Sequence, residues 1–252
     1  MARLEGRAAL VTGAARGIGA ATAVKLAADG AKVAVCDLRE DDCAETVGAI
    51  AREGGTAIAI GCDVRSREQV EAAVERTVSE LGAIDILVNN AGVIRDNLLF
   101  KMSDDDWDTV LDTHLKGSFL CTRAAQRHMV ARRYGKVVLL SSSSALGNRG
   151  QTNYSSAKAG LQGMARTLAI ELGRFNINVN AVAPGYVSTA MTRETAERVG
   201  VEFEDFEKAA IERIPLGRAG TPDDVANVIA FLVSDESSYV SGQVLYVNGG
   251  RR

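Results

Sequence analysis

Tyr154 and Lys158 have the most chemically informative spacing in this chain of 252 residues. Residues four positions apart lie on one face of a helix, so a helix here would direct the phenol and the ammonium group into the same space. A free tyrosine, with a pKa of about 10, is a weak proton donor or acceptor at neutral pH. A neighbouring cation favours the phenolate, so we expect Lys158 to lower the pKa of Tyr154 for general acid–base catalysis.

An ordinary amphipathic helix also contains Tyr-x-x-x-Lys, so the interpretation depends on what surrounds the pair. A strand-like run at 8–11 precedes the turn 12–19, whose glycines at 13, 17 and 19 open an alanine-rich helical run. Such a turn serves plain strand–helix packing, or it lets the backbone approach a pyrophosphate at the positive end of the helix. Asp37 ends the next apolar strand, where a dinucleotide fold places the acid that holds ribose hydroxyls.

Two further segments place small or polar residues just after an apolar strand. They are Asn89-Asn90-Ala91-Gly92 and Ala183-Pro184-Gly185-Tyr186-Val187-Ser188-Thr189. Each alone is compatible with a surface turn. Ligands bind beyond the carboxyl ends of strands in open α/β sheets, so the features together, in this order, predict a cofactor-dependent active site.

The elements that position these residues alternate along the chain. Strand-like runs fall at 8–12, 32–36, 56–61, 84–89, 136–141, 177–182 and 243–247. Helical runs fall at 17–29, 40–53, 66–81, 103–132, 153–173 and 222–233. This alternation predicts a single α/β domain over 1–252: a Rossmann-type, doubly wound sheet of seven mostly parallel strands with helices on both faces.

Composition narrows the function classes. With 29 basic and 32 acidic residues the net charge is −3, which is unlike the basic footprint of a nucleic-acid-binding protein. The four cysteines (Cys36, Cys43, Cys62 and Cys121) have no metal-ligand spacing, and we predict free thiols and no metal site. We see no signal peptide and no long apolar span, so we expect a cytoplasmic protein with no membrane partner.

Taken together, these motifs resemble the short-chain dehydrogenase/reductase family over essentially the whole chain. The chain is most similar to 3-oxoacyl-[acyl-carrier-protein] reductases and related 3-hydroxyacyl-CoA dehydrogenases. The matching segments are 12–19, 63–64, 89–92, 95–99, 150–160, 184–189 and 247–250.

The resemblance implies an NAD(P)-dependent oxidoreductase that interconverts a 3-oxoacyl thioester and its 3-hydroxyacyl form by hydride transfer. Tyr154 would be the general acid/base, and Lys158 would also bind the nicotinamide ribose. The alternatives are a dehydrogenase of a small alcohol, sugar or steroid on the same fold, and a non-catalytic dinucleotide-binding sensor. An intact Tyr154/Lys158 pair disfavours the sensor.

The same resemblance implies the cofactor contacts. They are Gly13, Arg16, Gly17, Ile18, Gly19, Asp37, Leu38, Asp63, Val64, Asn90, Ala91, Gly92, Tyr154, Lys158, Pro184, Gly185, Val187 and Thr189. NAD(H) is favoured because the Asp37 carboxylate would repel a 2′-phosphate. NADP(H) remains possible because Arg16 and Arg39 lie close by in the sequence.

The serine that binds the substrate oxygen is ambiguous, because residues 141–144 are all serine. Counting back from Tyr154 selects Ser141, and counting forward along the strand from Lys136 selects Ser142. Core packing fixes strand register, whereas loops tolerate deletions, so we favour Ser142.

The resemblance also implies three further features. His114 stands where the family usually has an Asn that supports a proton relay, and it is either part of a modified relay or a structural helix histidine. The segment at about 190–214 would be a substrate lid, with a pair of solvated surface helices as the alternative. Long helices at 103–132 and 153–173 would pair in a homotetramer.

Overall fold

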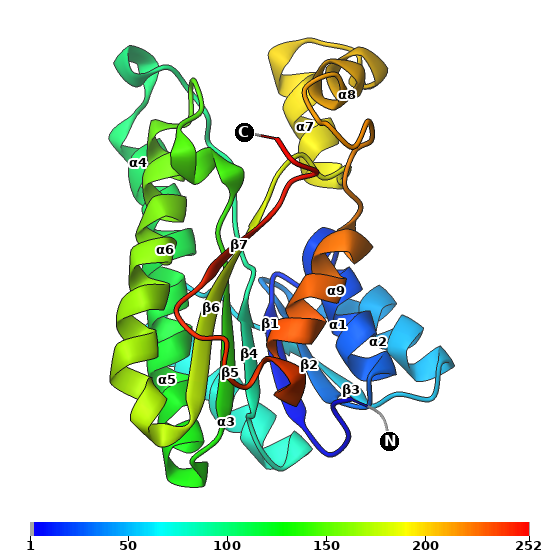
Figure 1. Ribbon diagram of the computed structural model, residues 1–252, viewed down its shortest axis with the longest axis vertical. Helices are drawn as coiled ribbons and strands as arrows, with labels where there is room; N and C mark the ends of the chain where they lie inside the picture. The colour runs from blue at the N-terminus through cyan, green and yellow to red at the C-terminus, as the bar shows by residue number, and fades with distance from the viewer. Residues whose placement is uncertain (1–2, 252) are drawn as a thin grey trace.

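The computed structural model describes residues 3–251, in which seven strands form one parallel sheet of order β3-β2-β1-β4-β5-β6-β7 (Figure 1). All six strand pairings are parallel. The strands are β1 (Ala8–Thr12), β2 (Lys32–Asp37), β3 (Ala57–Gly61), β4 (Ile86–Asn89), β5 (Gly135–Leu140), β6 (Ile177–Pro184) and β7 (Val244–Val247). The predicted doubly wound sheet is confirmed, with every pairing parallel.

Helices cover both faces of this sheet (Figure 1). They are α1 (Gly17–Ala28), α2 (Ala44–Arg52), α3 (Arg67–Leu81), α4 (Asp104–Leu111), α5 (Gly117–Arg132), α6 (Thr152–Leu172), α7 (Ala190–Val199), α8 (Phe203–Ile211) and α9 (Pro222–Leu232). Apolar residues of α1, α2 and α9 form one buried layer with the sheet, and those of α3, α5 and α6 form the other. Strands buried on both faces read as continuous apolar runs, which is why their positions were predictable.

The predicted helix 103–132 is interrupted. Asp112–Lys116 forms a π-turn between α4 and α5, and the N–H of Gly117 donates to the carbonyl of Asp112. Such turns are rare and occur often at functional sites. This one carries His114, which is buried against Gly92 in the loop after β4.

Helices α7 and α8 stand beyond the carboxyl ends of the strands, in the segment that the sequence predicts as a lid (Figure 1). Thr189 caps α7 by accepting a hydrogen bond from the N–H of Thr192, and Gly200 ends it with positive φ. Within residues 3–251, no helix combines the length and apolar character required to cross a membrane.

Candidate active site

Tyr154 and Lys158 lie on α6 beside the carboxyl end of β5. The Nζ of Lys158 is 5.3 Å from the centroid of the Tyr154 ring, and it donates a hydrogen bond to the carbonyl of Leu140. The helix therefore places the two side chains in one space, as their spacing predicts.

Burial dominates the titration of both groups. It raises the pKa of Tyr154 to about 12, the hydrogen bond from the Ser142 side chain opposes this, and the negative charge of Asp96 adds to it. Burial also lowers the pKa of Lys158 to about 7. The expectation that Lys158 lowers the pKa of Tyr154 is therefore not met in the cofactor-free chain, because desolvation disfavours both charged forms.

Ser141 and Ser142 point to different partners. The hydroxyl of Ser142 interacts with the Tyr154 phenol and accepts a hydrogen bond from the N–H of Ser144 at 3.1 Å. The hydroxyl of Ser141 donates to the carbonyl of Lys158 at 2.9 Å and accepts from the Gln162 amide at 3.1 Å. Ser141 is thus occupied in packing α6 against β5, whereas Ser142 faces the phenol.

His114 lies at the other side of Tyr154, with ring centroids 5.1 Å apart in an edge-to-face contact. Its Nε2 is 2.8 Å from the carbonyl of Val93, while its buried Nδ1 has no hydrogen-bond partner. Burial and the charge of Lys158 hold its pKa well below the usual range, so the ring is neutral. A Cβ at Gly92 would lie 2.2 Å from the His114 ring, so the histidine occupies space that only glycine leaves free.

The glycine turn has the shape and the charge that a pyrophosphate needs. Helix α1 begins after Arg16 with no side-chain cap and no acidic residue in its first turn, so its N-terminal dipole is uncompensated. Gly17 has a φ of +61°, and a Cβ there would meet only the Thr189 methyl group, at 3.9 Å. The turn fits a dinucleotide on these grounds.

Hydrogen bonds join the carboxyl end of β1 to the loop that follows β4. The Asn90 amide donates to the carbonyls of Thr12 and Gly13, and the N–H groups of Asn90 and Ala91 donate to the Thr12 hydroxyl. A Cβ at Gly13 would lie 2.7 Å from the Cα of Ala91. These contacts join the strand ends at the switch between β1 and β4, the place where such sheets bind ligands.

Asp37 ends β2 beside this turn. Its carboxylate accepts hydrogen bonds from the N–H of Ala15 at 2.9 Å and the N–H of Leu38 at 2.8 Å. Leu38 itself is exposed. Asp37 therefore shapes the glycine turn in addition to carrying negative charge at the adenosine end of the predicted site.

The remaining predicted cofactor residues fall into two groups. Ile18, Gly19, Val64, Pro184, Gly185 and Val187 pack into the walls around the strand ends. Two charged residues are engaged elsewhere: Arg16 pairs with Glu194 of α7 at 2.9 Å, and the Asp63 carboxylate pairs with Arg65 at 2.7 Å.

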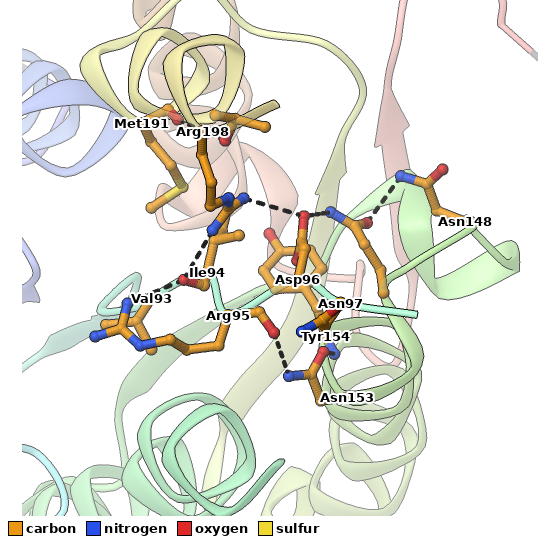
Figure 2. A network of polar contacts seen from close by, with 12 residues as sticks. Val93, Ile94, Arg95, Asp96, Asn97, Asn148, Asn153, Tyr154, Met191 and Arg198 are labelled. Carbon is orange, nitrogen blue, oxygen red and sulfur yellow. Dashed lines mark hydrogen bonds and ion pairs between the residues drawn. The ribbon is translucent and has the colours of Figure 1, made fainter. Parts of the chain in front are cut away.

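A polar network that the sequence did not predict lies in front of Tyr154 (Figure 2). Asp96 accepts hydrogen bonds from Gln151 at 2.8 Å and from Arg198 of α7 at 3.5 Å. Asn153 donates to the carbonyls of Arg95 and Asp106 at 2.8 and 3.0 Å. Asp96 and Gln151 stand within motifs that indicated the family, but no sequence signal links either to Arg198, which is 102 positions from Asp96.

Comparisons with known proteins agree with this geometry. A family model described as enoyl-(acyl carrier protein) reductase matches residues 13–252. Short-chain reductase protein NovJ of Streptomyces niveus is 49% identical, with 96% of this chain and 93% of NovJ covered. The chain belongs to the short-chain dehydrogenase/reductase family.

Two other members are similar over nearly their full length. The 3-oxoacyl-[acyl-carrier-protein] reductase FabG of Thermotoga maritima is 45% identical, with 98% of both chains covered. A crystal structure from Sinorhizobium meliloti 1021, assigned to the short-chain alcohol dehydrogenases by resemblance, is 41% identical with a TM-score of 0.92 and covers 98% of this chain and 96% of its own. The chain is accordingly an oxidoreductase of this family and uses a nicotinamide dinucleotide.

Proposed function

We propose that this short-chain reductase interconverts a 3-oxoacyl thioester and its 3-hydroxyacyl form. The observation that carries the proposal is the cluster of Tyr154, Lys158 and Ser142 at the carboxyl end of β5, bordered by the network of Asp96 and Gln151. Both network residues belong to segments typical of acyl reductases. The similarity to FabG supports the same substrate class.

Each member of the cluster has a defined role in the proposed reaction. Nicotinamide, when bound, supplies or accepts the hydride at the carbonyl carbon. The Ser142 hydroxyl binds the substrate oxygen, and Tyr154 donates its proton to that oxygen during reduction or accepts it during oxidation. Lys158 holds the nicotinamide ribose, and its low pKa lets it return a proton towards Tyr154.

His114 would extend this proton path. Its neutral ring has a buried Nδ1 without a partner, and the positive charge of Lys158 acts on it. A water molecule between the two groups would satisfy that nitrogen. We therefore assign His114 to the relay and not only to helix packing.

NAD(H) is the proposed cofactor. The turn 13–19 and the strand-end loops would hold its pyrophosphate and nicotinamide, and Asp37 would accept hydrogen bonds from the adenosine ribose. A 2′-phosphate would meet the same carboxylate, while the nearby cation Arg16 is paired with Glu194.

We further propose that the protein is a homotetramer in a reducing compartment, the cytoplasm. Trp107, Phe119 and Ile170 expose apolar surface on α4, α5 and α6, the helices expected to pair. All four cysteines are buried free thiols, which suits that compartment.

A substrate panel tests the proposed function. Initial rates would be measured with 3-oxoacyl, 2-enoyl and 3-hydroxyacyl thioesters and with small alcohols, sugars and steroids, each with both nicotinamide cofactors. We expect the highest kcat/KM for the 3-oxoacyl or 3-hydroxyacyl thioesters with NAD(H). Preference for 2-enoyl thioesters, or for an alcohol, sugar or steroid, would contradict the proposal, and no turnover across the panel would favour a sensor.

A further inference from the structure

Asp96 joins three separate parts of the site (Figure 2). It lies in the loop after β4, and one carboxylate oxygen accepts from Gln151, which precedes α6, and from Arg198 on α7. Arg198 also donates to the carbonyl of Ile94 at 3.4 Å. A single carboxylate oxygen thus links α7 to the residue that precedes α6, the helix that carries Tyr154. We call the contact between Asp96 and Arg198 the tie.

We propose that Asp96 is a positioning residue that couples the seating of α7 over the substrate to the protonation of Tyr154. The inference takes the identity of the reaction from the proposed function. The link between Asp96 and α7 itself depends only on the observed contacts. Asp96 need not touch substrate or cofactor, since it acts through Arg198 and through its charge.

The tie is built from a mostly buried anion and a partly exposed cation. The Asp96 side chain is 18% exposed and that of Arg198 is 39% exposed. The other Asp96 oxygen is buried without a partner, so burial raises the pKa of this carboxyl despite the contacts with Gln151 and Arg198. In the alkaline range where Tyr154 titrates, the carboxyl is ionised, and its charge opposes ionisation of the phenol.

Charged and titratable groups from several elements surround the phenol in the described part of the chain. Lys158 comes from α6, His114 from the π-turn, Asp96 from the loop after β4, and Arg198 from α7. The guanidinium of Arg95 turns to the carbonyl of Ile94. The Asp106 side chain of α4 accepts a hydrogen bond from the N–H of Ser103, the N-cap of that helix.

Both substitutions weaken the tie and have opposite electrostatic effects: Asn keeps an acceptor oxygen but no charge for Arg198, and Met has no donor for Asp96. Asp96→Asn removes a negative charge near Tyr154, which favours the phenolate and lowers its pKa. Arg198→Met leaves Asp96 without its cation, so the phenolate is opposed more strongly and the pKa rises. If the tie only held α7 in place, both variants would hydrate the phenol and shift its pKa downward together.

The test combines kinetics and hydrogen exchange on full-length protein. During reduction Tyr154 must be protonated, so kcat/KM falls as pH rises through its pKa in the complete enzyme. We expect this alkaline limb to move down in D96N and up in R198M, each by about half a pH unit. KM should rise several-fold in both. Arg193→Met is the matched control, because Arg193 lies on α7 but stacks on Phe203 and not on Asp96. The alkaline limb of the kcat/KM profile should stay in place in this variant.

Hydrogen exchange of α7 amides in the absence of substrate tests the tie independently of turnover. We expect faster exchange in D96N and R198M, and wild-type exchange in R193M. Unchanged exchange in D96N and R198M would overturn the tie whatever the substrate, and a shift of both pH profiles in the same direction would overturn the electrostatic coupling. If wild type turns over no acyl thioester, the proposed function fails while the exchange result still decides the tie.

Discussion

The two serines at the end of β5 have different partners. Ser142 faces Tyr154, whereas Ser141 is bonded to the backbone of α6 and to Gln162. Adjacent residues in extended backbone point to opposite sides, so strand register decides which hydroxyl can meet a substrate. Core packing along 136–140 made that register predictable, even though counting back from Tyr154 pointed to the other serine.

Ser142→Ala should lower kcat/KM by about 100-fold, because it removes a hydroxyl that stabilises the reacting oxygen. Ser141→Ala is the matched control: it should retain most activity and lose only about 1 kcal/mol of stability. Steady-state kinetics and urea unfolding of both variants make the comparison. A large activity loss in S141A alone would reverse the assignment.

Lys158 should make the stability of the cofactor-free protein depend on pH. Its folded pKa of about 7 lies below the ordinary value of 10.5, so between these values the unfolded chain binds a proton that the folded chain lacks. The free energy of unfolding should therefore fall as pH falls from about 9 to about 7, by at most about 1.4 kcal/mol per pH unit. Lys158→Met should remove this component.

Urea unfolding at a pH of about 7 and about 9 measures that difference. The exposed Lys32→Met is the control and should keep the wild-type dependence. An identical pH dependence in wild type and K158M would show that Lys158 is not desolvated in the folded chain.

Secondary-structure elements differ in how well the sequence predicted them. Strands at 8–12 and 32–36 were placed within two residues, because each is largely an apolar run buried on both sheet faces. The strand at 177–182 was placed equally well, although the buried Asn178 and Asn180 alternate with its apolar residues. The π-turn at 112–116 was missed, since hydrophobic periodicity does not distinguish one extra residue within a helix. The tie between Asp96 and Arg198 was missed because it depends on how α7 folds back over the site.

The junction of β2 with the glycine turn should set cofactor preference. Asp37→Asn removes the negative charge and keeps one oxygen as an acceptor for the backbone of the turn. We expect the ratio of kcat/KM for NADH to that for NADPH to fall about tenfold, because the repulsion of a 2′-phosphate is lost. Asp41→Asn, which makes the same charge change outside the turn, is the control. An unchanged ratio in D37N would place the selectivity elsewhere.

Several large apolar side chains are exposed on the outer helices of the molecule. Exposed side chains on α4, α5 and α6 include Trp107, Phe119 and Ile170. We expect light scattering at micromolar concentration to give about four times the chain mass of 26.6 kDa. Ile170→Glu should weaken assembly, because it introduces a charge into the proposed interface. A monomeric mass for wild type would contradict the tetramer.

The central claim, that Tyr154 transfers the proton while hydride moves to or from a 3-oxoacyl thioester, is tested most directly by Tyr154→Phe. This change removes one oxygen and retains the ring that packs against His114. The measurement is kcat for 3-oxoacyl thioester reduction, with cofactor affinity determined on the same sample. The account predicts at least about a 100-fold loss of kcat with cofactor affinity nearly unchanged. Retention of most turnover in this variant would contradict it.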